Sequence, residues 1–220
     1  MHILVVGAGR GLGLHLAAEA LKRGHKVAAS CRTMTADLTD LKTEYGESLL
    51  TVKLDLREEG SIARAAVEIQ DKLGYLNSII NNAGVLLGRN DSIRGIQLSD
   101  LEESFAVNLF GPMLIMKHCD SLLAKDQPGV VVNVSSESAL DMGPRDFPYS
   151  LTKHALNAFS QKLQSHYAGT AVKVYAVHPG WMKTDMGGPN APLDPRVSAE
   201  RILNIVEGKT IPNSVFVESL

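Results

Sequence analysis

The sequence predicts an α/β protein in which a doubly wound, mostly parallel sheet of seven strands carries helices on both faces. Short β-branched runs alternate with longer stretches of helical period, which is the order of elements in such a sheet. The runs are nearly continuous in apolar residues, as is typical of strands covered on both sides. A length of 220 residues suits one domain, so we expect residues 1–220 to form a single domain.

The predicted strands are residues 2–6, 26–31, 49–53, 78–81, 130–134, 173–178 and 215–217. One helix is expected to follow the first strand and stop at Gly24, and others to begin near Leu101, Tyr149 and Ser198. The Gly/Pro-rich stretch 187–195 is interpreted as a loop. Sheets of this kind bind ligands beyond the carboxyl ends of their strands, so motifs that directly follow strands are the candidates for function.

Composition and charge favour a small-molecule ligand and a cytoplasmic location. The formal net charge is -2 with both signs scattered, so we expect no nucleic-acid partner and no membrane partner. We expect neither a signal peptide nor a membrane-spanning run. Cys31 and Cys119 are too few for a disulfide framework and are interpreted as reduced core thiols. His2, His118 and His178 lack metal-ligand spacing, so we expect no metal site.

A glycine-rich turn, residues 7–13, joins the first strand to its helix. Glycine lets the backbone turn tightly and approach a pyrophosphate, which then rests on the helix N-terminus. A tight turn without a ligand is the alternative for this pattern taken alone. The spacing G-x-x-x-G-x-G differs from the G-x-G-x-x-G of most dinucleotide folds. We expect the turn to contact a dinucleotide through Gly7, Gly9, Arg10, Gly11, Leu12 and Gly13.

The candidate catalytic residues are Tyr149, Lys153, Ser136 and Asn108. Tyr149 and Lys153 are four positions apart and therefore lie on one face of a predicted helix. Alone, such a pair is often a surface pair. Here Ser136 follows the fifth predicted strand, thirteen positions before Tyr149, and Asn108 lies in the preceding predicted helix, within V-N-L-F-G.

Two further motifs follow strands, N-N-A-G at residues 81–84 and P-G-W-M-K-T at residues 179–184. The chain thus carries five motifs: the glycine turn, N-N-A-G, V-N-L-F-G, Ser136 with Tyr149 and Lys153, and P-G-W-M-K-T. In type and order, these motifs resemble those of the short-chain dehydrogenase/reductase family. The resemblance implies the Rossmann form of the doubly wound fold, a nicotinamide cofactor and oxidoreductase activity. The segments 177–188 and 191–194 are similar to those of the sniffer-like and C-factor-like carbonyl reductases within that family.

The resemblance also implies a role for each catalytic candidate. Reduction of a carbonyl requires a proton for the oxygen, and Tyr149 is the expected acid. Lys153 and oxidised nicotinamide would bring the phenol pKa from about 10 to about 7, a shift of about 4 kcal/mol, and Lys153 would also hold the nicotinamide ribose. Ser136 would donate a second hydrogen bond to the carbonyl. Ser135 is the weaker candidate and is interpreted as structural.

Asn108 would belong to a proton relay that reaches the lysine. Pro112 follows it by four positions and lacks the amide hydrogen that would bond the Asn108 carbonyl. This predicts either a carbonyl that is free to hold a relay water or an incidental kink in the helix.

NADP is the expected cofactor. Family members that use NAD usually carry an acidic residue at the end of the second strand, whereas a 2'-phosphate requires cations. Here that strand ends without a carboxylate, Arg32 lies at its end, and Arg10 lies in the glycine turn. Solvated surface arginines are the alternative. The other expected cofactor contacts are Asp55 and Leu56 at the adenine, then Asn82, Ala83, Gly84, Tyr149, Lys153, Pro179, Gly180, Met182 and, at the nicotinamide carboxamide, Thr184.

The expected substrate is a small uncharged aldehyde, ketone or dicarbonyl, because the candidate pocket walls are mostly apolar. These walls are Leu86, Leu87, Met142, Phe147, Trp181 and Met186. An acidic substrate is the alternative, because Arg145 or Lys183 could bind its negative charge.

Two alternatives concern assembly and function. Relatives pair helices across a two-fold axis, which implies a homodimer or homotetramer with Phe105, Phe159 and Leu163 as candidate interface residues; buried core is the alternative for the same side chains. A regulatory or signalling protein that binds the nucleotide with little turnover is the alternative function. The intact catalytic set favours turnover.

Overall fold

The sheet has seven strands in the order β3-β2-β1-β4-β5-β6-β7, and all neighbouring strands pair in parallel. The computed structural model describes residues 1–89, 93–140, 143–144 and 146–217. The strands are β1 His2–Val6, β2 Lys26–Cys31, β3 Leu49–Lys53, β4 Ser78–Asn81, β5 Gly129–Val134, β6 Val172–Val177 and β7 Phe216–Val217. The prediction of seven strands in a parallel, doubly wound sheet is confirmed, with bounds that differ by one residue at β5, β6 and β7.

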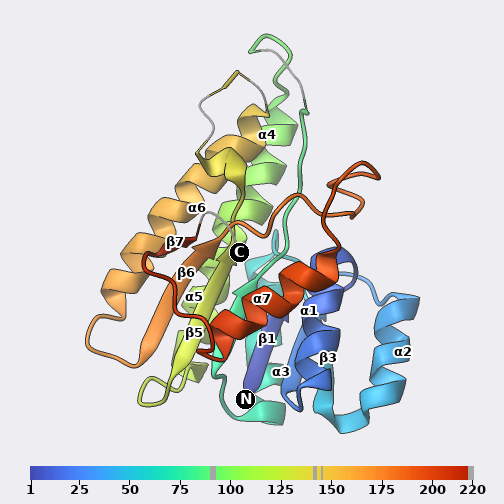
Figure 1. The fold of residues 1–220 in the computed structure, drawn as a ribbon, viewed down its shortest axis with the longest axis vertical. Helices are drawn as coiled ribbons and strands as arrows, with labels where there is room; N and C mark the ends of the chain where they lie inside the picture. The colour runs from blue at the N-terminus through green and yellow to red at the C-terminus, as the bar shows by residue number, and fades with distance from the viewer. Residues whose placement is uncertain (90–92, 141–142, 145, 218–220) are drawn as a thin grey trace.

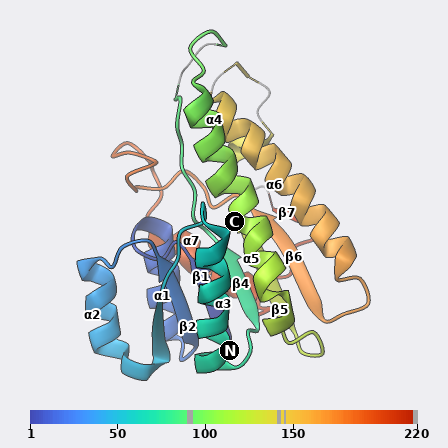
Figure 2. The same ribbon diagram turned by 180° about the vertical axis from the view of Figure 1, so that it is seen from behind.

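Helices cover both faces of the sheet, as expected from the continuous apolar strands (Figures 1 and 2). One face carries α1 (Gly11–Lys22), α2 (Ala36–Tyr45) and α7 (Pro195–Val206). The other face carries α3 (Glu59–Leu73), α5 (Gly111–Cys119) and α6 (Phe147–His166). Helix α4 (Leu98–Phe105) continues through a π-helical turn, η2 (Ala106–Phe110), into α5. Short 3-10 turns are η1 (Gly46–Ser48), η3 (Asp120–Leu122) and η4 (Glu137–Ala139).

The central strand β1 divides its side chains between two apolar cores. Ile3 and Val5 pack against the face of α1 and α7, whereas Leu4 and Val6 pack against the face of α3, α5 and α6. All four side chains are at most 1% exposed. Each such burial stabilises the fold by about 1.5–3 kcal/mol, so β1 is held firmly in the middle of the sheet.

The order in which strands are added to the sheet reverses between β1 and β4. Strands β2 and β3 lie on one side of β1, and strands β4 to β7 lie on the other side. A sheet of this topology has a crevice at that point, beyond the carboxyl ends of the strands. The glycine turn after β1 and the segment after β4 both open into it.

Helix bounds differ from the predictions where a capping residue lies earlier than the apolar pattern. Helix α7 begins at Pro195 rather than Ser198, because the Asp194 side chain accepts a hydrogen bond from the Arg196 amide and starts the helix there. Helix α1 ends just before Gly24, whose φ of 82° is the expected left-handed stop. Two of the candidate interface residues belong to the core. Leu163 is buried in it and Phe159 packs against it, which agrees with the alternative of buried core for these two side chains.

Among the residues described, no helix combines the length and apolar character needed to cross a membrane.

Candidate active site

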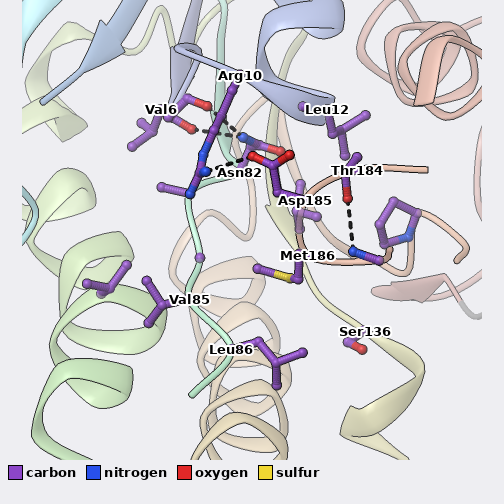
Figure 3. Close-up of a pocket in the computed structure, with 18 of the residues that line it drawn as sticks. Val6, Arg10, Leu12, Asn82, Val85, Leu86, Ser136, Thr184, Asp185 and Met186 are labelled. Atoms are coloured by element: carbon purple, nitrogen blue, oxygen red, sulfur yellow. Dashed lines mark hydrogen bonds and ion pairs between the residues drawn. The ribbon is translucent and has the colours of Figure 1, made fainter. Parts of the chain in front are cut away.

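A cleft of about 1150 Å³ lies beyond the carboxyl ends of the strands. It brings together the predicted site residues with two exceptions, Gly13 and Asn108, which lie behind its wall. The predicted residues that line it are Gly7, Gly9, Arg10, Gly11, Leu12, Arg32, Asp55, Leu56, Asn82, Ala83, Gly84, Ser136, Tyr149, Lys153, Pro179, Gly180, Met182 and Thr184. Figure 3 shows how side chains from several segments converge on this space.

The glycine turn is packed so tightly that side chains are excluded at its two ends. Gly7 has a φ of 80°, and a Cβ there would lie 2.7 Å from the Ala83 Cβ. A Cβ at Gly13 would overlap the Gly7 carbonyl oxygen and lie 2.5 Å from Asn82 Nδ2. Asn82 Nδ2 donates to the Gly7 carbonyl at 3.0 Å and fixes the turn against the segment after β4. These contacts explain why Gly13 is needed although it does not line the cleft.

The N-terminus of α1 is free to bind an anion. No side chain caps it, and its first turn contains no acidic residue. Gly11 and Leu12 of this first turn line the cleft, so the positive end of the helix dipole and the first amide hydrogens, which have no partner within the helix itself, lie beside it. A glycine turn next to such a helix end fits a pyrophosphate.

Tyr149 and Lys153 occupy the inner wall of the cleft from helix α6, and both side chains are buried. Lys153 Nζ lies 5.5 Å from the centroid of the Tyr149 ring and donates to the Val134 carbonyl oxygen at 2.8 Å. Burial lowers the pKa of Lys153 to about 8. The ammonium has two further hydrogens, which the Val134 carbonyl does not use.

The pKa of Tyr149 is raised. Burial is the largest cause; a hydrogen bond with Ser136 lowers the pKa, the charge of Asp146 raises it, and the charge of Arg89 lowers it. The lowering expected from the sequence concerns Lys153 together with bound oxidised nicotinamide, whereas among the protein groups alone desolvation outweighs the neighbouring charges. Tyr149 is therefore a protonated phenol at neutral pH, the form that a proton donor requires.

Asn108 lies in η2 and is fully buried behind the cleft. Its Oδ1 accepts from the Val85 amide at 2.8 Å, and its Nδ2 donates to the Val85 carbonyl at 2.9 Å and to Thr152 Oγ1 at 3.1 Å. The side chain thus joins the segment after β4 to helix α6. A Cβ at Gly84 would lie 3.4 Å from Asn108 Oδ1 and 3.7 Å from Lys153 Nζ, so Gly84 separates the two polar groups.

The two serines after β5 have different surroundings. Ser136 lines the cleft, and its hydroxyl accepts from the Ser138 amide at 3.1 Å. The Ser135 hydroxyl is buried and donates to Asn157 Oδ1 at 2.6 Å. This contact agrees with the structural interpretation of Ser135 and leaves Ser136 as the serine beside the phenol.

The segment after β6 closes the opposite side of the cleft. The Thr184 hydroxyl accepts from the Gly187 amide at 3.2 Å, and Trp181 Nε1 donates to the Gly187 carbonyl at 2.8 Å. Buried Ser198 donates to the Pro179 carbonyl at 2.6 Å and anchors the segment to α7. The segment is a compact loop, as expected for residues 187–195.

Two of the arginines that line the cleft have different partners. Arg32 is exposed at the end of β2. Its charge adds to the effect of the Arg57 hydrogen bonds, the main cause that lowers the pKa of Asp55 to about 2. Arg10 Nη1 lies 2.7 Å from Asp185 Oδ2, and this exposed ion pair joins the glycine turn to the segment after β6 (Figure 3).

The sequence and the fold of the chain were compared with those of known proteins. A family model described as "short chain dehydrogenase" matches residues 1–192. The chain belongs to the short-chain dehydrogenase/reductase family of oxidoreductases. This confirms the resemblance that the five motifs indicate.

Among curated relatives of this short-chain dehydrogenase, tazN of Aspergillus terreus is 36% identical over 86% of the chain and 43% of that protein. The NADPH-dependent pterin aldehyde reductase of Arabidopsis thaliana is 28% identical over 84% of the chain and 76% of that protein. Among solved structures, the carbonyl reductase Sniffer of D. melanogaster has a TM-score of 0.86 at 27% identity, covering 93% of this chain and 90% of its own. The NADPH-bound carbonyl reductase from chicken fatty liver has a TM-score of 0.83 at 27% identity and the same coverage.

Of the candidate pocket walls, Leu86, Trp181 and Met186 line the cleft as expected, whereas Leu87 and Phe147 are not among the described residues that do. The candidates Met142 and Arg145 lie outside the described residues.

Four charged residues that line the cleft were not among the predicted site residues: Arg89, Glu137, Asp146 and Asp185. Asp185 meets Arg10 across 175 positions of the chain, so spacing along the sequence could not indicate this pair. Within the described part of the chain, no group of three or more His, Cys, Asp or Glu is placed to hold a metal ion.

Proposed function

We propose that the chain is an NADPH-dependent reductase of small aldehydes or ketones. The observation that carries this proposal is a buried, protonated Tyr149 in contact with Ser136, at the inner end of a cleft that begins at an uncapped helix N-terminus. A proton donor and an anion site within one cleft are what a dinucleotide-dependent carbonyl reduction requires.

NADP fits the residues at the outer end of the cleft. The pyrophosphate would rest on the glycine turn, where added Cβ atoms at Gly7 and Gly13 would collide with their neighbours. Arg32, with Arg10 after release from Asp185, would bind the 2'-phosphate. Sniffer and the chicken enzyme are carbonyl reductases, and the chicken enzyme has NADPH bound, which supports the same assignment here.

The catalytic residues would divide the reaction between proton transfer and positioning. When bound, the nicotinamide supplies the hydride for the carbonyl carbon. Tyr149 gives its hydroxyl proton to the carbonyl oxygen as the C=O double bond becomes a single bond, and Ser136 donates a hydrogen bond to the same oxygen. Lys153, held by Val134, favours the resulting phenolate by its charge and offers its remaining hydrogens to the nicotinamide ribose.

Turnover is tested by following NADPH oxidation with a panel of aldehydes and ketones. We expect activity in the unsubstituted protein and a loss of about 100-fold or more in Tyr149→Phe, with NADPH binding within about twofold. Ser150→Ala, on the same helix, is the control for substitution near the site. Tight NADPH binding without turnover of any carbonyl would favour the regulatory alternative. Full activity in Tyr149→Phe would contradict the mechanism.

Cofactor choice is tested separately. Charge-assisted hydrogen bonds to a phosphate are worth about 1.5–3 kcal/mol each, so Arg10→Ala with Arg32→Ala should remove most of the preference for NADPH over NADH. Dissociation constants of both cofactors, with Arg64→Ala as a control outside the cleft, decide the point. Unchanged discrimination would place the 2'-phosphate elsewhere.

A further inference from the structure

Arg89 lies at the substrate end of the cleft, on the segment that follows β4. Its Nη2 donates to the carbonyl oxygen of Met186 at 2.7 Å, on the loop after β6. The guanidinium therefore extends between two segments that line the cleft. Leu86 and Met186, which are labelled in Figure 3, belong to these segments and are apolar. An arginine has five donor hydrogens, and a neutral carbonyl oxygen uses one of them.

The charge of Arg89 has no carboxylate partner among the described residues, in contrast to Arg10, Arg23, Arg57 and Arg196. Its contact with Met186 is a hydrogen bond to a neutral group, which does not compensate the positive charge. Because the planar fork of a guanidinium matches the two oxygens of a carboxylate, the free edge of Arg89 is suited to a single carboxylate.

Four acidic side chains also line the cleft, and their positions decide which charge a substrate meets near Arg89. Asp55 is paired with Arg57. Asp185 is paired with Arg10. Glu137 is exposed, and its charge acts on His178 at the end of β6. Asp146 precedes helix α6, and its charge acts on Tyr149 in opposition to that of Arg89. Beside the charge of Lys153, the phenol thus lies in the fields of Asp146 and Arg89, and an anionic group at the mouth of the cleft would be drawn towards Arg89.

We propose that Arg89 binds a carboxylate on the carbonyl substrate, so that the chain reduces aldehydes or ketones that also carry a carboxylate group. This inference rests on the proposed reductase function and replaces the uncharged substrate expected from the sequence. The carbonyl oxygen would meet Tyr149 and Ser136, while the carboxylate would meet Arg89 at the mouth of the cleft. Arg89 is thus a specificity residue rather than a participant in proton or hydride transfer.

The test compares three benzaldehydes of similar size: 4-carboxybenzaldehyde, its neutral methyl ester, and the cationic 4-formyl-N,N,N-trimethylanilinium. NADPH oxidation is measured for the unsubstituted protein and for Arg89→Gln, Arg89→Lys and Arg94→Gln. Arg94 is an exposed arginine of the same segment that does not line the cleft, so it controls for the loss of a nearby charge.

We expect kcat/KM for the carboxylate to exceed that for the ester by about 10-fold or more, and Arg89→Gln to remove this preference with less than about a twofold effect on the ester. Arg89→Lys should keep part of the preference, and Arg94→Gln all of it. An equal loss for both aldehydes would show that Arg89 only holds the Met186 loop. Preference for the cationic aldehyde would identify Asp146 as the determinant.

A binding measurement separates this inference from the proposed function. The alcohol product, 4-(hydroxymethyl)benzoate, is titrated into the protein with NADP⁺ by calorimetry, which requires no turnover. Binding that weakens about 10-fold in Arg89→Gln supports the carboxylate site even if no aldehyde is reduced, whereas equal binding overturns it. Turnover of the ester with no carboxylate preference would overturn the inference and leave the reductase function standing.

Discussion

Lys153 should give the stability of this protein a characteristic pH dependence. The residue is 3% exposed, and burial lowers the pKa of its ammonium group from the ordinary value of 10.5 to about 8. Between these two values the unfolded chain binds a proton that the folded chain does not. The free energy of unfolding therefore rises with pH across this interval, by about 1.4 kcal/mol per pH unit and about 3 kcal/mol in all.

Substitution by methionine isolates this effect. Lys153→Met removes the buried charge but keeps an unbranched apolar stem, so it should be more stable than the unsubstituted protein at pH 7, apart from the lost bond to Val134. The advantage of Lys153→Met should be constant below about pH 7.5 and should shrink by about 1.4 kcal/mol per unit between pH 8 and 10.5.

The assay is urea unfolding at half-unit steps from pH 7 to 10.5 without added cofactor, read as the difference between variant and unsubstituted protein. Because both proteins share all other titrating groups, the difference removes the effects of tyrosines and cysteines. Lys162→Met, an exposed lysine on the same helix, controls for the general effect of one charge. A difference that stays constant from pH 8 to 10.5, or that grows, would refute the desolvation of Lys153.

Two further predictions concern the cofactor end of the cleft. Gly13→Ala should destabilise the fold by about 1–3 kcal/mol or more and prevent NADPH binding, because its Cβ would overlap the Gly7 carbonyl oxygen. Gly11→Ala, with a φ of 54° and a nearest neighbour 3.6 Å away, should lose only about 1–2 kcal/mol through backbone strain; urea unfolding compares the two, and the reverse order would contradict this packing. Asp185→Asn should free Arg10 and tighten NADPH binding by up to about fivefold with NADH unchanged, as measured by fluorescence titration. Weaker NADPH binding in Asp185→Asn would mean that the pair holds the cleft in its binding form.

Most of the fold could be predicted because the strands are apolar on both faces. In β1 and β2, four consecutive residues are buried in each strand, as expected for a parallel strand that is covered on both faces. Helix starts were harder to predict, since Leu98 and Pro195 lie outside the periodic apolar pattern of their helices. The cap formed by the Asp194 side chain determines where α7 begins, and the spacing of apolar residues does not predict this cap.

The site was predictable where it consists of motifs and not where it depends on folding. Tyr149, Ser136 and the glycine turn are placed by short spacings along the chain, and the structure brings them to one cleft. The partners of Arg10 and Arg89 lie 175 and 97 positions away, so spacing could not reveal them. The effect of burial on the pKa of Tyr149 could not be predicted from spacing either, because the depth of burial of a side chain depends on the packing of the whole fold.

The π-helical turn at residues 106–110 makes the length of this segment important. An α-helix turns about 100° per residue, and a π-helical turn accommodates about one extra residue within an otherwise regular helix. Deletion of one residue here would rotate α4 relative to α5 by about that angle and carry Asn108 away from Val85 and Thr152. We therefore expect natural variants of this protein to accept substitutions at exposed Phe110 and Met113 but to keep the number of residues between Leu98 and Cys119 fixed.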